Sequence, residues 1–109
     1  MQEHRELLQL FAKSARTLLG GHLKKILVFG SYARGDYHEG SDIDIMILTS
    51  LPDKENEAFS DELYGIAFDY EIDYGIVINP ILKNEEHFNY WLGALPFYNN
   101  VLKDGVEIG

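Results

Sequence analysis

The stretch GSYARGDYHEGSDIDIMIL, residues 30–48, decides the fold. It follows the apolar run KILVF, residues 25–29, and it ends with Asp42 and Asp44 inside a second apolar run. Side chains two residues apart on a strand point to the same face, so the two carboxylates project together. There they repel each other and are costly to desolvate. A divalent cation removes both costs, because hard cations such as Mg²⁺ take carboxylate oxygens.

The turn before the two aspartates bears on whether they bind a ligand. For a bare Asp-x-Asp pair the alternative is an exposed strand start, with both side chains in water. Gly30, however, follows an apolar strand directly, and a glycine there lets the backbone approach a ligand closely. If the next N–H groups open a helical turn they form an anion site, to which Ser31 adds a hydroxyl and Arg34 a guanidinium. A phosphate-binding turn beside a carboxylate pair suits a metal–nucleotide complex.

The same stretch resembles the signature of the polymerase beta-like nucleotidyltransferase superfamily. In that signature, Gly-Ser and a helical turn carrying Ala-Arg-Gly precede Asp-x-Asp on the next strand. Within the superfamily it resembles most the minimal nucleotidyltransferases of bacteria and archaea, the MNT group. The residues that fall at the family's spacing are Gly30, Ser31, Ala33, Arg34, Gly35, Ser41, Asp42 and Asp44. Gly40 departs from the pattern, since many members carry an acid there, but that acid is not a metal ligand.

The resemblance implies a metal site with a third acid from a later strand. The family holds two Mg²⁺ ions between these carboxylates and a triphosphate. Asp69, Glu71 and Asp73 share a parity, so they could share a face if the strand expected over residues 70–78 begins early. We choose Asp73, because the sequence becomes continuously apolar just after it, and assign it as the candidate base. The implied metal ligands and catalytic residues are Asp42, Asp44 and Asp73, and the implied nucleotide-binding residues are Gly30, Ser31 and Arg34.

The resemblance also implies a function. The family transfers a nucleoside monophosphate, most often AMP from ATP, to a hydroxyl and releases pyrophosphate. The MNT group often works beside a HEPN-domain protein, as the antitoxin to a toxic ribonuclease, and some members modify a toxin tyrosine with AMP. A HEPN-type protein is therefore the expected partner and acceptor. Two alternatives stay open: a non-catalytic antitoxin or binding module that neutralises a partner by contact, and a nucleotidyltransferase with a small-molecule acceptor.

The rest of the chain predicts an α/β fold. We expect one domain over residues 1–109, a small mixed β-sheet of three or more strands with helices packed on it. The resemblance implies that this is the polymerase beta-like nucleotidyltransferase palm. The expected helices are residues 4–19, 54–68, 84–92 and 97–103. The expected strands are residues 25–30, 42–49 and 70–78, the last ended by Asn79-Pro80.

Composition narrows the function further. The chain has 18 acids against 9 bases, a net charge of −9, which argues against a long nucleic acid but suits ATP with a metal, or a basic protein partner. It has no cysteine, so it holds neither a disulfide nor a cysteine-based zinc site. No apolar run reaches the roughly 18 residues that span a bilayer, and no signal-peptide pattern begins the chain. A cytoplasmic protein without membrane contact is expected.

The histidines and the aromatic residues of the tail carry weaker signals. The four histidines have no ligand-like spacing and are interpreted as surface residues, with His38 the nearest to the motif. The tail aromatics indicate a core that packs the last helices or, alternatively, a partner surface. They are Phe88, Tyr90, Trp91, Phe97 and Tyr98.

Overall fold

The computed structural model describes residues 4–36, 38 and 40–109, and these form one mixed sheet with helices on both faces. The strand order is β3-β2-β1-β4. β2 is antiparallel to β1 and parallel to β3, and β4 is antiparallel to β1. The strands are β1 (Leu23–Phe29), β2 (Ile43–Thr49), β3 (Ile78–Asn84) and β4 (Val106–Glu107). The predicted α/β fold with a small mixed sheet is confirmed.

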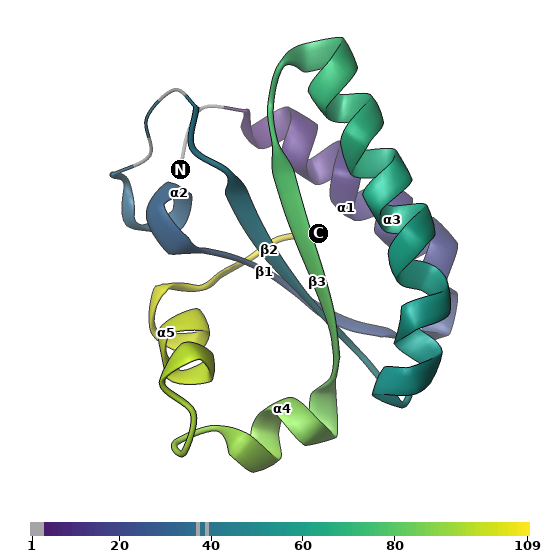
Figure 1. The fold of residues 1–109 in the computed structure, drawn as a ribbon, viewed down its shortest axis with the longest axis vertical. Coiled ribbons are helices and arrows are strands. Elements are labelled where there is room, and N and C mark those ends of the chain that lie inside the picture. Colours follow the sequence, from purple (N-terminus) through teal and green to yellow (C-terminus); the bar gives the residue numbers. More distant parts are fainter. Residues whose placement is uncertain (1–3, 37, 39) are drawn as a thin grey trace.

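The helices divide between the two faces of the sheet (Figure 1). α1 and α3 cover one face, and α4 and α5 cover the other, while the single turn of α2 connects β1 to the loop before β2. The bounds are α1 (Arg5–Leu19), a 3-10 turn η1 (Gly20–His22), α2 (Gly30–Arg34), α3 (Asp53–Tyr74), α4 (Glu85–Trp91) and α5 (Pro96–Asp104). None of the helices in the described part of the chain combines the length and apolar character needed to cross a bilayer.

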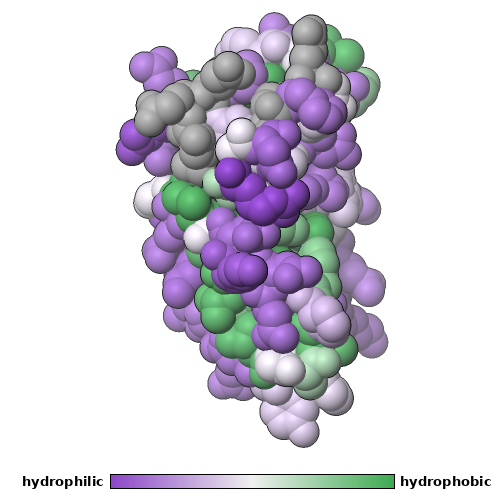
Figure 2. Space-filling view, turned by 90° about the vertical axis from the view of Figure 1, so that its left-hand side faces the viewer, coloured by the Kyte–Doolittle hydropathy of each residue, from purple (hydrophilic) through white to green (hydrophobic). Residues whose placement is uncertain are grey.

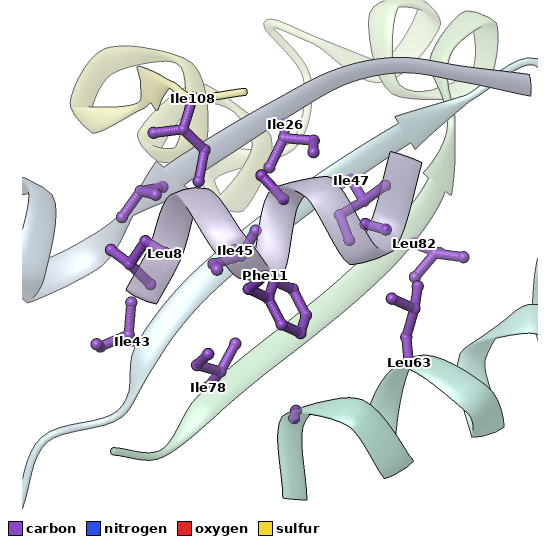
Figure 3. Close-up of a cluster of buried hydrophobic side chains, with 14 of the residues drawn as sticks. Leu8, Phe11, Ile26, Ile43, Ile45, Ile47, Leu63, Ile78, Leu82 and Ile108 are labelled. Atoms are coloured by element: carbon purple, nitrogen blue, oxygen red, sulfur yellow. The ribbon is translucent and has the colours of Figure 1, made fainter. Parts of the chain in front are cut away.

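The alternation of β2 fixes which face receives the motif. Ile43, Ile45 and Ile47 are fully buried under α1 and α3, where they pack with residues such as Phe11 and Leu63 (Figure 3). The residues between them face the other way, and Met46 and Leu48 belong to a second buried cluster. That cluster also contains Leu27, Phe29, Phe88, Tyr98 and Val101. Asp44 therefore lies on the face that carries α4 and α5.

α3 is longer than the sequence predicted. It continues to Tyr74 and is followed by Gly75, so the strand expected over residues 70–78 is wrong. Acids alternate there with apolar residues, which imitates the period of a strand. In the structure Tyr70 packs edge-on against Phe11, with ring centroids 5.8 Å apart, while the acids of this segment point to water. The aromatic contact to α1 thus keeps the segment helical.

β3 begins where the sequence analysis placed the end of a strand. Asn79 and Pro80 lie inside β3, so their assignment as a strand end is wrong. A proline has no N–H to give to a sheet, and it is tolerated at an edge. β3 is an edge strand, since it pairs only with β2 among the described residues. The pairing of β4 with Leu27 and Val28 was also not predicted.

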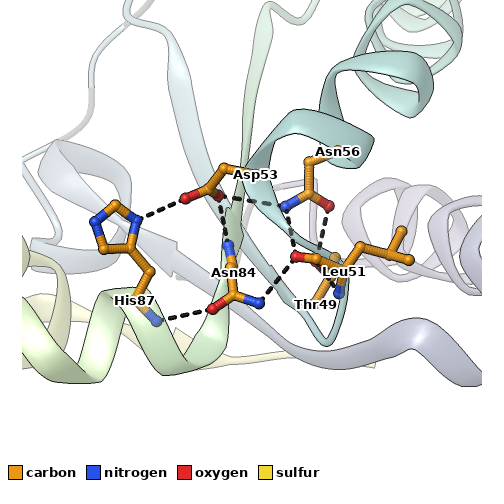
Figure 4. Close-up of polar contacts among 6 residues, drawn as sticks. All are labelled: Thr49, Leu51, Asp53, Asn56, Asn84 and His87. Atoms are coloured by element: carbon orange, nitrogen blue, oxygen red, sulfur yellow. Dashed lines mark hydrogen bonds and ion pairs between the residues drawn. The ribbon is translucent and has the colours of Figure 1, made fainter.

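A polar network closes the end of the sheet where β2 and β3 finish (Figure 4). Asp53 accepts the backbone N–H of Asn84 at 2.8 Å and lies 2.6 Å from Nδ1 of His87. The Asn84 side chain accepts the backbone N–H of His87 and so caps α4. Burial by itself raises the pKa of Asp53, but hydrogen bonds from Asn84, His87 and Asn56, together with the charge of Lys83, lower it. The network joins α3 to α4 and lies at the opposite end of β2 from the motif.

Candidate functional site

The two halves of the motif meet where β1 ends and β2 begins. The sheet register pairs Phe29, the last residue of β1, with Asp44. Gly30 comes next, with a φ of +76°, and a Cβ built on it would lie 2.7 Å from Oδ2 of Asp44. Real Cβ atoms essentially never come that close, and L side chains rarely adopt that φ. The glycine therefore allows its backbone to lie directly against the Asp44 carboxylate.

Asp44 has a second neighbour, on β3. The parallel register pairs it with Asn79, and Nδ2 of Asn79 donates to Oδ1 of Asp44 at 3.2 Å. Asp44 is half-buried, whereas Asp42, just before the strand, is exposed. Ile43 between them is buried in the core under α1 and α3. The structure thus holds Asp44 from two sides and leaves Asp42 at the rim.

The predicted phosphate-binding residues lie in α2. Ser31 is half-buried, and its backbone oxygen accepts the N–H groups of Gly35 and Asp36, which closes the turn. Nη1 of Arg34 donates to Asp104 at 3.1 Å, and its Nε lies 3.5 Å from Asp36. The hydrogen bond to Asp104 and the charge of Asp36 raise the pKa of Arg34, so the guanidinium stays charged. Arg34 ties α2 to α5, and a phosphate would share it with these two acids.

The structure does not bring Asp73 to the other two predicted ligands. Asp73 lies exposed in the last turn of α3, because the segment is a helix and not a strand. No group of three histidine, cysteine, aspartate or glutamate side chains within the described residues is placed to hold a metal ion. β3 itself contains no acid. The structure therefore does not group Asp73 with Asp42 and Asp44, and the metal-binding role of these acids stays a prediction.

The sequence analysis missed Asn79. It is the β3 residue that contacts Asp44, and it was taken for part of a turn because Pro80 follows it. Asn79 contacts Asp44, and Asp42 lies two residues before Asp44, so these three residues are the candidate donors at this end of β2. Carboxylate and amide oxygens are ligands that Mg²⁺ and Ca²⁺ accept. The residues thus fit one hard divalent cation, and they do not fit a centre built on three carboxylates.

The tail aromatics divide between core and surface. Phe88 and Tyr98 are buried in the second cluster, while Tyr90, Trp91 and Phe97 are exposed. Figure 2 shows apolar side chains among polar ones on the lower part of the face where α4 and α5 lie. The ring of Phe97 packs edge-on against Phe29, with centroids 5.7 Å apart. The exposed apolar surface therefore reaches the end of β1, next to Gly30.

Known proteins share this sequence pattern over nearly the whole chain. The family described as "Nucleotidyltransferase domain" matches residues 8–106. The chain is 40% identical over 103 residues to a protein of Methanocaldococcus jannaschii named putative protein adenylyltransferase, covering 87% of each chain. It is 38% identical over 104 residues to a second protein of that name from the same organism, covering 94% of this chain and 96% of the relative. The chain therefore belongs to the nucleotidyltransferase domain family and is a nucleotidyltransferase with the polymerase beta-like fold.

Proposed function

We propose that this nucleotidyltransferase transfers AMP from ATP to a hydroxyl group on a protein, and that the protein is a HEPN-type toxin for which this chain is the antitoxin. The observation that carries the transfer reaction is the half-buried Asp44, held against the backbone of Gly30 at the end of a Gly-Ser turn. A carboxylate beside a phosphate-binding turn suits a metal-bound nucleotide. The relatives named protein adenylyltransferases support AMP as the group and a protein as the acceptor.

Each residue of the motif has a role in this proposal. The turn of Gly30 and Ser31 binds the terminal phosphates, and Arg34 supports it with a fixed positive charge. Asp42 and Asp44 hold Mg²⁺, which when bound neutralises the triphosphate and polarises the phosphorus under attack. Positioning of the two substrates supplies much of the remaining rate enhancement.

The transfer needs no reactant besides ATP and the acceptor hydroxyl. The acceptor oxygen forms a bond to the α-phosphorus of ATP, and the bond from that phosphorus to the bridging oxygen breaks. Pyrophosphate leaves with the bonding electrons. The hydroxyl proton passes to Asp42 or Asp44, since Asp73 is an exposed residue of α3 and no metal-binding group of three such side chains forms among the described residues.

Charge and surface support a protein partner. The net charge of −9 favours a basic partner and speeds its approach at low salt. The apolar surface of α4 and α5, with Tyr90, Trp91 and Phe97 exposed, adjoins the end of β1. A partner seated there would bring its own hydroxyl close to Asp44. Aromatic residues of this kind are enriched at protein interfaces.

One observation favours a second candidate function. The site has two carboxylates where the family resemblance implies three. A site with less negative charge binds a metal more weakly, which suits a module that neutralises its partner by contact alone. The two functions share the partner and differ in whether AMP is transferred.

Incubation of the chain with ATP, Mg²⁺ and a HEPN-type protein encoded by a neighbouring gene separates the two functions. Mass spectrometry should find AMP added to a tyrosine of the partner. Asp44→Asn should abolish the modification. Asp73→Asn is the matched control, since it makes the same change in an exposed acid of α3, and it should leave the modification intact.

Other outcomes of this experiment would each point to a different function. A partner that is inhibited in a tight complex but carries no AMP supports the contact-only module. A partner that does not associate removes the antitoxin role, and AMP found instead on a small molecule would identify a different acceptor. Loss of the modification in both variants would show that the effect is not located at Asp44.

A further inference from the structure

We propose that Asn79 positions Asp44 for metal binding. Together with Asp42 and Asp44 it forms a centre of two carboxylates and one amide, which binds one divalent cation in the absence of nucleotide. This inference rests on the proposed function, because it concerns the same site. It adds a residue that the motif does not contain. It also assigns the centre a capacity of one cation instead of two.

The position of Asn79 is fixed by the sheet. Asn79 is the β3 partner of Asp44 in the parallel register, and the neighbouring pairs run in step from Ile43–Ile78 to Thr49–Asn84. A shift of one residue would bring Ile78 or Pro80 opposite Asp44 and expose their apolar side chains on the wrong face. The buried Ile78 and Pro80 prevent such a shift. The amide is therefore held beside the carboxylate by the core.

The chemistry of the amide suits a positioning role. Nδ2 of Asn79 donates to Oδ1 of Asp44 at 3.2 Å, while Oδ2 of Asp44 lies against Gly30. An aspartate at position 79 could not donate this bond, since an ionised carboxylate only accepts hydrogen bonds, and it would repel Asp44. The amide fixes the orientation of Asp44 without adding charge. Partners that orient a metal ligand in this way contribute substantially to metal affinity.

The charge at the centre sets its capacity. Asp42 and Asp44 together carry the charge that one divalent cation neutralises. Within the part of the chain that the structure describes, no third acid joins them. A second cation would need a further anionic ligand that the described residues do not supply at this centre. In this protein, the phosphates of a nucleotide are the ligands at hand for it.

Titration with Mn²⁺ in the absence of nucleotide and acceptor tests the inference. Free Mn²⁺ is followed by electron paramagnetic resonance for the parent, Asn79→Ala and Asn79→Asp. The parent should bind one Mn²⁺ per chain. Asn79→Ala should bind it about tenfold more weakly, as expected for the loss of a residue that orients a ligand. Asn79→Asp should bind it about tenfold more tightly, or take a second Mn²⁺, because affinity for hard cations rises with the number of charged ligands.

A matched control removes the general effect of an added negative charge. Asn89→Asp makes the same exchange at an exposed position of α4, and it should bind Mn²⁺ as the parent does. Thermal unfolding is a second measurement. Asn79→Asp should melt below the parent in EDTA, because two carboxylates then face each other, and it should recover the difference when Mn²⁺ is added.

The inference is overturned if the parent binds no Mn²⁺ or binds two. It is also overturned if Asn79→Ala and Asn79→Asp titrate like the parent, or if Asn89→Asp changes affinity as much as Asn79→Asp does. These results do not depend on AMP transfer. The proposed function fails separately, when no acceptor is modified by a parent protein that binds the metal.

Discussion

Gly30→Ala tests whether the close packing of the turn against Asp44 is what makes the site work. The substitution adds one methyl group. At the φ of +76° that Gly30 adopts, an L residue costs about 1–2 kcal/mol. For a domain of this size we therefore expect a melting temperature roughly 5–10 °C lower than that of the parent. This part of the effect concerns the backbone alone.

The second part of the effect concerns Asp44. The new Cβ would lie 2.7 Å from Oδ2, and ordinary contact begins at 3.4 Å, so the oxygen has to retreat by 0.7 Å, the difference of the two, to reach ordinary contact. That movement also disturbs the 3.2 Å hydrogen bond from Asn79. Misplacement of a reacting group by about 1 Å can reduce a rate about a hundredfold. We expect AMP transfer to fall between about tenfold and a hundredfold.

Gly35→Ala is the control, because it carries the same backbone cost without the collision. Gly35 has a φ of +89°, and nothing lies within 4 Å of the position of its Cβ. Both variants should lose similar stability in a thermal melt, but only Gly30→Ala should lose AMP transfer, measured with labelled ATP below both melting temperatures. Equal transfer by the two variants would refute the role of the Gly30–Asp44 contact. A large loss of transfer in Gly35→Ala would show that stability alone explains the result.

Three further predictions concern other residues. Asp44→Asn should abolish transfer without lowering the melting temperature, while Asp73→Asn should transfer at the parental rate; a transfer defect in Asp73→Asn would restore it to the site. Asp53→Asn should lower the stability to urea at pH 7, and the difference from the parent should vanish in acid. The reason is that the pKa of Asp53 is lowered from its ordinary value of 3.8, so its ionised form stabilises the fold above that value. This stabilisation is lost as the pH falls through the folded-state pKa. A difference that persists well below that pKa would show that the charge of Asp53 is not responsible. Asp104→Asn removes a partner of Arg34 and should tighten ATP binding in calorimetry; an unchanged affinity would show that Arg34 does not bind phosphate.

The motif and the first half of the fold could be predicted from the sequence, because their patterns are local. Apolar periodicity gave residues 4–19 and 42–49 within a residue or two of the observed α1 and β2. The segment 70–78 could not be predicted in this way, since its alternation of acids and apolar residues fits a strand as well as a helix. The contact of Tyr70 with Phe11, which supports the helix, joins residues far apart in the chain.

The candidate site was predictable only in the part that a single motif contains. Gly30 and Asp44 lie within 15 residues of each other in the sequence, and the structure brings them together as the motif indicates. Asn79 lies 35 residues from Asp44, and its position depends on the register of β3. Nothing local in the sequence distinguishes an asparagine before a proline in a strand from one in a turn. The strand that pairs with Asp44 was therefore sought in the wrong segment.

Pro80 has a consequence for the behaviour of the protein at high concentration. β3 forms one edge of the sheet, and an open edge can recruit the strand of another molecule and start aggregation. A proline in that strand removes a hydrogen-bond donor and interrupts such pairing. Pro80→Val would restore the donor within the run Ile78–Leu82, which is otherwise apolar apart from Asn79. Pro80 thus limits aggregation at this edge without adding a charge. A charged residue at this position would disturb the site, because the neighbouring Asn79 contacts Asp44.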